Sequence, residues 1–161
     1  MDRTEVARLL RALAEQVESA DEVEAETNST TFDFEDGNGP VPGHRHDNPD
    51  GSEGGWVADT AAVAATAWVS GTARVSGNAE VSDTARVSGN AQVFGTARVY
   101  NTARVFGNAR VFGTAEVSGN AQVFGTAWVS DTAWVSGNAW VFGTARVFGN
   151  ARVSEGTHDG S

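Results

Sequence analysis

The most regular pattern in the chain is a valine at every sixth position, from Val57 to Val153, which occurs 17 times without a gap. An alanine stands two positions before each valine from Ala61 to Ala151, and the unit typically reads A-x-V-[S/F]-[G/D]-[T/N]. Because inward and outward positions alternate over A-x-V, each repeat predicts a short strand that buries its Ala and Val. The Gly or Asp and the Thr or Asn that follow are typical of a tight corner.

Two other arrangements of this repeat are disfavoured. A period of six does not match the 3.6-residue period of an α-helix, and every unit contains residues with poor helix propensity. A flat sheet of hairpins would place all Ala and Val side chains on one face and leave that face uncovered. The repeat therefore predicts an all-β solenoid, in which the chain winds around its own apolar side chains.

The same unit resembles the hexapeptide repeat of left-handed parallel β-helices, the fold of the trimeric acyltransferase-like superfamily. It is most similar to arrays of the form G-N-A-x-V, whose role is unknown. The resemblance covers residues 56–154 and implies a single-stranded, left-handed parallel β-helix with three repeats per triangular coil. Seventeen repeats then give about 5.7 coils of 18 residues each. The left-handed winding is implied by the resemblance alone.

An 18-residue coil places outward side chains that lie 18 positions apart in one column. Aromatic residues occupy such columns on two of the three faces, and those expected at an interface are Phe94, Phe106, Phe112, Phe124, Phe142, Phe148, Trp128 and Trp140. Exposed aromatic columns are typical of protein–protein interfaces, most simply a homotrimer of this chain, with another protein as a further possible partner. The alternative is that the rings stack within one chain and stabilise a monomer.

Polar columns accompany the aromatic ones. Glu80, Arg98 and Glu116 form an alternating charge ladder on the second face. Trp128 lies between two arginines of its own column, Arg110 and Arg146, which favours cation–π contact. Asp59, Asp83 and Asp131 replace Gly at corners and are interpreted as turn residues.

The amino-terminal part follows a different pattern. Apolar residues on one stripe predict a helix over residues 2–19, and residues 22–27 and 30–34 predict a short hairpin. The stretch from Arg3 to Glu18 resembles the start of a small haloarchaeal domain of the amphi-Trp type. We therefore expect a small α+β segment over residues 1–35, a flexible acidic linker over 36–55, the β-helix over 56–154 and a polar tail over 155–161.

The net charge of −10 lies almost entirely in residues 1–55, and the chain contains no Lys. An acidic amino-terminal part and a nearly neutral repeat region argue against nucleic acid as a partner. Acidic, Lys-free composition suggests adaptation to high salt, as in a halophilic archaeon. No apolar run predicts a signal peptide or a membrane span, so a cytoplasmic location is expected.

The residues that could carry chemistry are few. The chain has no Cys, and the repeat region has no His, although related acyltransferases use a His base and related carbonic anhydrases bind zinc through His. His44, His46 and Asp47 are weak candidates for a divalent metal site. We therefore expect a non-catalytic structural or interaction module without a cofactor. The alternatives are a trimeric acyltransferase-like enzyme with sites between subunits and a protein that polymerises end to end.

Overall fold

The computed structural model describes residues 3–7 and 30–161, and the chain divides into two compact units, Met1–Thr30 and Thr31–Ser161. Residues 3–7 are helical, at the start of the helix predicted over residues 2–19. The rest of that helix and the predicted strand over residues 22–27 lie outside the described residues. No helix in the described part of the chain has the length and apolar character needed to cross a membrane.

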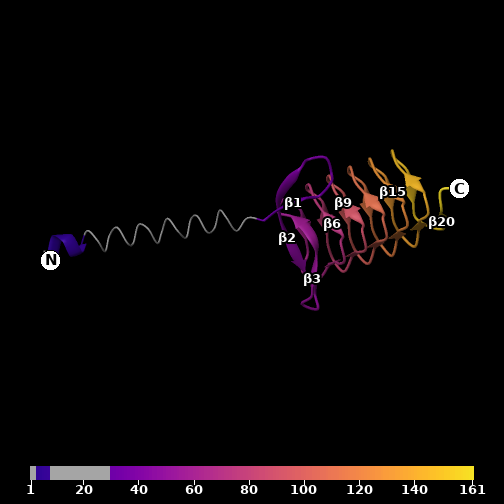
Figure 1. Cartoon of the computed structure of the whole chain (residues 1–161). Coiled ribbons are helices and arrows are strands. Elements are labelled where there is room, and N and C mark those ends of the chain that lie inside the picture. Colours follow the sequence, from indigo (N-terminus) through magenta and orange to yellow (C-terminus); the bar gives the residue numbers. More distant parts are fainter. Residues whose placement is uncertain (1–2, 8–29) are drawn as a thin grey trace. The chain divides into compact units, whose positions relative to one another are not determined.

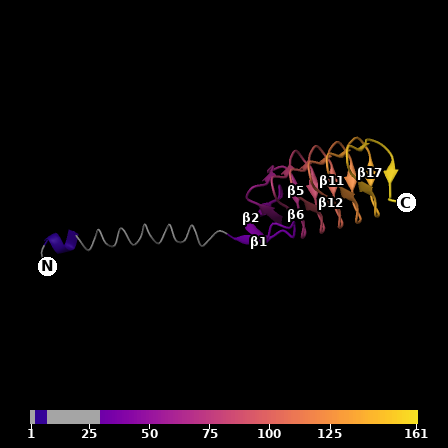
Figure 2. The same ribbon diagram turned by 90° about the horizontal axis from the view of Figure 1, so that it is seen from above.

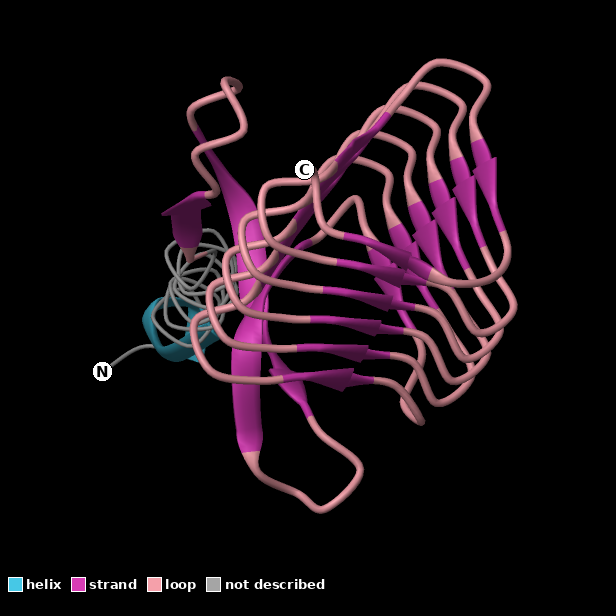
Figure 3. Cartoon of the chain, turned by 90° about the vertical axis from the view of Figure 1, so that its right-hand side faces the viewer, coloured by secondary structure: helices cyan, strands magenta, loops and turns pink. Residues whose placement is uncertain are grey.

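The second unit is an all-β parallel solenoid of about six turns (Figures 1 and 2). Short strands from successive coils form three sheets around the core, as Figure 3 shows with the chain turned through a right angle. Within the regular coils each residue pairs with the residue 18 positions further on, for example Val75 with Val93 and Val99 with Val117. The predicted period is therefore confirmed, whereas the left-handed winding stays a prediction.

Each coil gives one strand to each sheet. In spatial order the first sheet contains β1 (Thr31–Asp33), β2 (Pro40–Asp47), β3 (Glu53–Ala58), β6 (Arg74–Val75), β9 (Gln92–Val93), β12 (Arg110–Val111), β15 (Trp128–Val129) and β18 (Arg146–Val147). The second contains β19 (Arg152–Val153), β16 (Trp134–Val135), β13 (Glu116–Val117), β10 (Arg98–Val99), β7 (Glu80–Val81) and β4 (Ala62–Val63). The third contains β20 (Thr157–His158), β17 (Trp140–Val141), β14 (Gln122–Val123), β11 (Arg104–Val105), β8 (Arg86–Val87) and β5 (Trp68–Val69).

The core consists of the repeated alanines and valines. From Ala67 to Val147 every Ala and Val at the two inward positions of the repeat is at most 6% exposed. Backbone hydrogen bonds join each coil to the next, as between Arg98 N and Ala115 O at 2.9 Å. The solenoid therefore buries a thin apolar core and pairs its backbone with its neighbours along the axis.

The corners are tightly stacked. At Gly95, where φ is +71°, an added Cβ would lie 2.9 Å from Gly113 O in the next coil. Asp83 and Asp131 occupy the equivalent position with φ of 57°. Their carboxylates accept hydrogen bonds from backbone N–H groups of the next coil, Asn101 N and Gly149 N, each at 2.9 Å. The interpretation of Asp83 and Asp131 as turn residues is confirmed.

Residues 40–58 form a hairpin at the amino-terminal end of the solenoid. Strand β2 pairs antiparallel with β1 and with β3, and β3 joins β6 in the first sheet. The predicted linker over residues 36–55 is therefore wrong for β2 and the start of β3. Its glycines allow close packing: a Cβ at Gly43 would meet the Phe34 ring at 3.0 Å, and one at Gly54 would lie 2.1 Å from Val69 O.

This hairpin also covers the first strand of the third sheet. His46 Nε2 donates to Ala67 O at 2.9 Å, and Asn48 Oδ1 accepts from Val69 N at 3.0 Å. Both side chains are buried, at 7% and 5% exposure. They satisfy backbone groups that an edge strand leaves unpaired.

The predicted polar tail over residues 155–161 is also partly ordered into the solenoid. Residues Thr157 and His158 form β20, which pairs with Trp140 and Val141 of β17. The offset here is 17 residues rather than 18, because the last corner is one residue shorter than the others. Backbone pairing continues the third sheet although the Ala–Val pattern has ended.

Candidate interaction surfaces

The third face of the solenoid carries a continuous column of stacked rings. Phe106, Phe124 and Phe142 stack with centroid distances of 4.8 and 5.1 Å and nearly parallel planes. Trp140 approaches Phe124 edge-on at 6.3 Å and is 45% exposed. The spacing follows from the distance of about 4.8 Å between adjacent strands. Each ring is thus partly covered by its own column and partly open to solvent.

The first face carries a second, shorter column. Phe94 stacks on Phe112 at 5.0 Å, and Trp128 meets Phe112 edge-on at 5.9 Å. The guanidinium groups of Arg110 and Arg146 lie 5.5 and 4.9 Å from the Trp128 ring, so the predicted cation–π contacts are formed.

Phe148, the last phenylalanine of the predicted interface, is not stacked in this column. Ser130 occupies the position between Phe112 and Phe148 along the first face. Phe148 is 63% exposed. The first face therefore presents an exposed ring that is separated from its stacked pair by one coil.

The second face is the polar one. Arg98 pairs with Glu80 at 3.4 Å, whereas Glu116 accepts a hydrogen bond from the Tyr100 hydroxyl at 3.1 Å. Of the predicted charge ladder, the ion pair between Glu80 and Arg98 is therefore formed, whereas Glu116 pairs with Tyr100 instead of Arg98. Exposed pairs of this kind contribute less than about 1 kcal/mol each.

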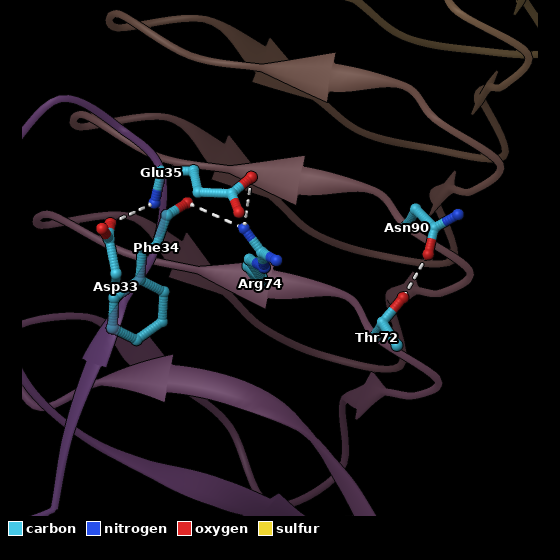
Figure 4. Close-up of polar contacts among 6 residues, drawn as sticks. All are labelled: Asp33, Phe34, Glu35, Thr72, Arg74 and Asn90. Atoms are coloured by element: carbon cyan, nitrogen blue, oxygen red, sulfur yellow. Dashed lines mark hydrogen bonds and ion pairs between the residues drawn. The ribbon is translucent and has the colours of Figure 1, made fainter. Parts of the chain in front are cut away.

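Residues 31–36 form an arm against the first face. Phe32 stacks on Trp56 at 4.5 Å, and the Arg74 guanidinium lies 5.3 Å from the Phe32 ring. Arg74 also pairs with Glu35 at 2.9 Å, as Figure 4 shows. These contacts hold the arm through one aromatic pair, one cation–π contact and one ion pair.

Asp36 also connects this arm to the solenoid. The Ser76 hydroxyl donates to its carboxylate at 2.7 Å. Partial burial raises the pKa of Asp36, but the hydrogen bonds from Ser76 and Asn38 lower it more, so that the pKa lies below its ordinary value.

A polar groove runs beside this arm, across the coils that follow. It is lined by Glu35, Thr72, Arg74, Asn90, Gln92, Asn108 and Arg110. Thr72 Oγ1 donates to Asn90 Oδ1 (Figure 4), and Asn90 Nδ2 donates to Asn108 Oδ1 at 3.1 Å. Gln92 is only 9% exposed, and its Oε1 has no hydrogen-bond partner among the described residues.

The structure assigns other contacts to two of the three candidate metal ligands. His44 Nδ1 donates to Asp59 Oδ1 at 2.9 Å, and His46 is bonded to Ala67 O. Asp47 lies exposed at the end of β2. Over residues 3–7 and 30–161 no three His, Asp or Glu side chains are grouped so that they could hold a metal ion.

Several residues of these surfaces were not singled out from the sequence. The arm and the amino-terminal hairpin depend on Phe32, Trp56 and Asn48, which lie in or next to a segment with the composition of a linker. The sequence pattern that would predict strand β2 is weak. Gln92, Asn90 and Asn108 follow the 18-residue period, which could have placed them in neighbouring columns. Their approach to Glu35 depends on the arm and has no sequence signal.

The fold and these surfaces define a β-solenoid repeat protein. A family model described as the YdcK β-solenoid repeat matches residues 145–161, which supports the same class. Comparison with curated proteins and with solved structures gave no significant match.

Proposed function

We propose that this chain is a non-catalytic structural or interaction module that associates with itself, most simply as a homotrimer. The observation that carries the proposal is the column of Phe106, Phe124 and Phe142, which runs along the third face and stays partly exposed. Aromatic residues are enriched at interfaces because their large apolar surface is released from water on association.

The distribution of side chains over the three faces supports a trimer. The first and third faces, which carry the aromatic columns, meet at the corner that contains Asn90 and Asn108. A ring of three triangular prisms buries two adjacent faces of each prism and leaves the third in solvent. The second face, with Glu80, Arg98 and Glu116, has the polar character expected of the solvated one.

The outward strand positions of the first and third faces carry arginines, such as Arg86 and Arg104, and no acidic residue. Burial of guanidinium groups without carboxylate partners is unfavourable. Stacking on tryptophan rings, as Arg86 stacks on Trp68, offsets part of this cost. The resemblance of the repeat to that of trimeric hexapeptide-repeat proteins also supports the proposed homotrimer.

The residues available for catalysis support a non-catalytic role. The repeat region has no His to act as the base of an acyltransferase. His44 and His46 are engaged by Asp59 and Ala67 O at the amino-terminal end. These hydrogen bonds of the two imidazoles stabilise the hairpin at the amino-terminal end of the solenoid.

Serine substitution in one column tests the proposal. Phe106→Ser, Phe124→Ser and Phe142→Ser combined keep the fold, because Ser70 and Ser88 already occupy this column. We expect the mass measured by sedimentation to fall from trimer to monomer while the circular dichroism spectrum is retained. Tyr100→Ser, on the polar second face, is the matched control and should leave the mass unchanged. A folded triple variant that keeps the mass of the parent chain would exclude this column as the interface.

A further inference from the structure

We propose that, in the homotrimer, Arg86 of one copy enters the polar groove on the first face of the next copy and donates there to Glu35 and to Gln92 Oε1. The inference rests on the proposed self-association and adds to it the polar contact that joins the third face of one copy to the first face of another. The groove is incomplete without the second copy, because Gln92 Oε1 has no partner among the described residues of its own chain.

Gln92 supplies an acceptor that lacks a donor. The residue is 9% exposed, and its Oε1 atom is buried without a hydrogen-bond partner among the described residues. Its neighbours in the column are engaged elsewhere, since Arg74 pairs with Glu35 and Arg110 lies over the Trp128 ring. Leaving a buried carbonyl oxygen unpaired is unfavourable, so this position requires an N–H or O–H group from outside the chain.

The arm over residues 31–36 places negative charge beside the same groove. It carries three carboxylates, Asp33, Glu35 and Asp36, of which only Glu35 forms an ion pair within the described part of the chain. Glu35 pairs with Arg74 at 2.9 Å (Figure 4), yet its side chain remains 65% exposed. Because a carboxylate accepts more than one hydrogen bond, Glu35 stays open to a second guanidinium.

Arg86 supplies the donor on the third face. It is exposed on β8, it lies beside Arg104 of β11, and it forms no ion pair with any described residue. Its guanidinium lies 5.2 Å from the Trp68 ring, and this stacking orients the plane and leaves the N–H edge free. The five N–H groups of a guanidinium can donate to a carboxylate and to an amide oxygen together.

The level of Arg86 along the solenoid matches that of the groove. In chain order Arg86 lies between Arg74, which holds Glu35, and Gln92, and all three fall within one coil of 18 residues. Rotation about a threefold axis parallel to the solenoid keeps this level, so Arg86 of one copy comes between Glu35 and Gln92 of the next. The groove also borders the corner at which the third and first faces meet. Arg104, one coil further on, lies beyond the level of both partners.

Sedimentation of the full chain over a range of concentrations tests the contact. Arg86→Gln should raise the concentration at which half of the trimer dissociates by about tenfold, because Glu35 and Gln92 lose their donor. Arg104→Gln is the matched control, since Arg104 has the same column and is also exposed, and it should change this midpoint by less than about twofold. Circular dichroism confirms that each variant is folded.

A double variant tests whether Arg86 and Glu35 act on one contact. Arg86→Gln combined with Glu35→Gln should shift the midpoint less than about twofold beyond the larger of the two single effects, because either change already removes the pair. Strictly additive shifts would overturn the assignment of Glu35 as the partner of Arg86.

Gln92→Met gives a result whose sign is decisive. The methionine keeps the length of the side chain and removes the acceptor. If Arg86 of the next copy donates to Oε1, the trimer dissociates more readily in this variant. If Oε1 has no donor in the assembly, the change leaves association as it is and raises the stability of the fold, which would overturn the proposal.

The results separate this contact from the assembly itself. A parent chain that is monomeric at every concentration overturns both proposals. A trimeric parent in which Arg86→Gln and Arg104→Gln have equal effects overturns the contact alone and leaves self-association in place.

Discussion

Single residues at the corners decide whether one repeat can stack on the next. The position two places after each valine is usually Gly with positive φ, and an added Cβ there meets the backbone of the next coil. Asp83 and Asp131 tolerate this position, and their carboxylates accept a hydrogen bond from the next coil. Their short polar side chains thus offset the cost of a left-handed backbone with an inter-coil hydrogen bond.

Substitution of Asp83 separates these two contributions. Asp83→Ala loses the hydrogen bond and keeps a side chain in the left-handed region, and we expect it to lower the free energy of unfolding by about 1–2 kcal/mol. Asp83→Gly loses the same bond but removes the backbone strain, so it should stay within about 0.5 kcal/mol of the parent chain. Urea unfolding followed by circular dichroism measures both. Equal losses in the two variants would show that backbone strain is not a determinant at this corner.

The hairpin of β2 and β3 is the element that ends the solenoid at its amino-terminal side. It extends the first sheet and satisfies the edge of the third through His46 and Asn48. Edge strands expose unpaired backbone groups, so this cap protects the first coil from non-native pairing.

Removal of one cap contact should loosen the first coil locally. Asn48→Ala leaves the Val69 N–H without its acceptor, at a cost of about 1–3 kcal/mol. Hydrogen exchange should then show faster exchange at Val69 and unchanged protection at Val105. Asn78→Ala serves as the control, because Asn78 is exposed and its side chain makes no hydrogen bond to any described residue. Unaltered exchange at Val69 would mean that Asn48 does not close this edge.

The arm adds a pH-dependent contact to the same end. The pKa of Asp36 is lowered in the folded chain, so the carboxylate stabilises the fold fully above its ordinary pKa of about 3.8. This contribution is lost as pH falls from that value through the lower folded pKa. We expect Asp36→Asn to be less stable than the parent chain at pH 6 and the difference to shrink below about pH 4. A difference that is constant from pH 6 to pH 3, measured by thermal unfolding, would contradict this account.

The repeated strands could be predicted from the sequence because one short unit fixes burial, strand and corner together. Val75, Val93 and Val111 recur with the period that pairs them, and all three are buried. The cap could not be predicted in this way, since Gly43 and Gly54 allow close approach rather than flexibility. Local composition does not distinguish these two roles of glycine. The polar groove beside the arm could be predicted only as columns of residues 18 positions apart. Its closure by Glu35 depends on the arm, whose position has no sequence signal.

At the scale of the whole molecule, charge is separated from the repeat. Residues 1–55 carry the net negative charge, whereas the repeat region is almost neutral. Self-repulsion among carboxylates destabilises a compact state and is screened by salt. We therefore predict that the melting temperature rises from low to molar KCl, as expected of a salt-adapted protein. Melting curves that coincide across this range would contradict the prediction.

The aromatic columns raise the question of what covers them, and the mass of the intact chain answers it most directly. Light scattering after size-exclusion chromatography, at low and at molar KCl, measures the absolute mass. The account predicts a discrete species of three times 16.8 kDa. A monomer of 16.8 kDa would contradict self-association and leave the columns as ladders within one chain, and very large species would indicate end-to-end polymers instead.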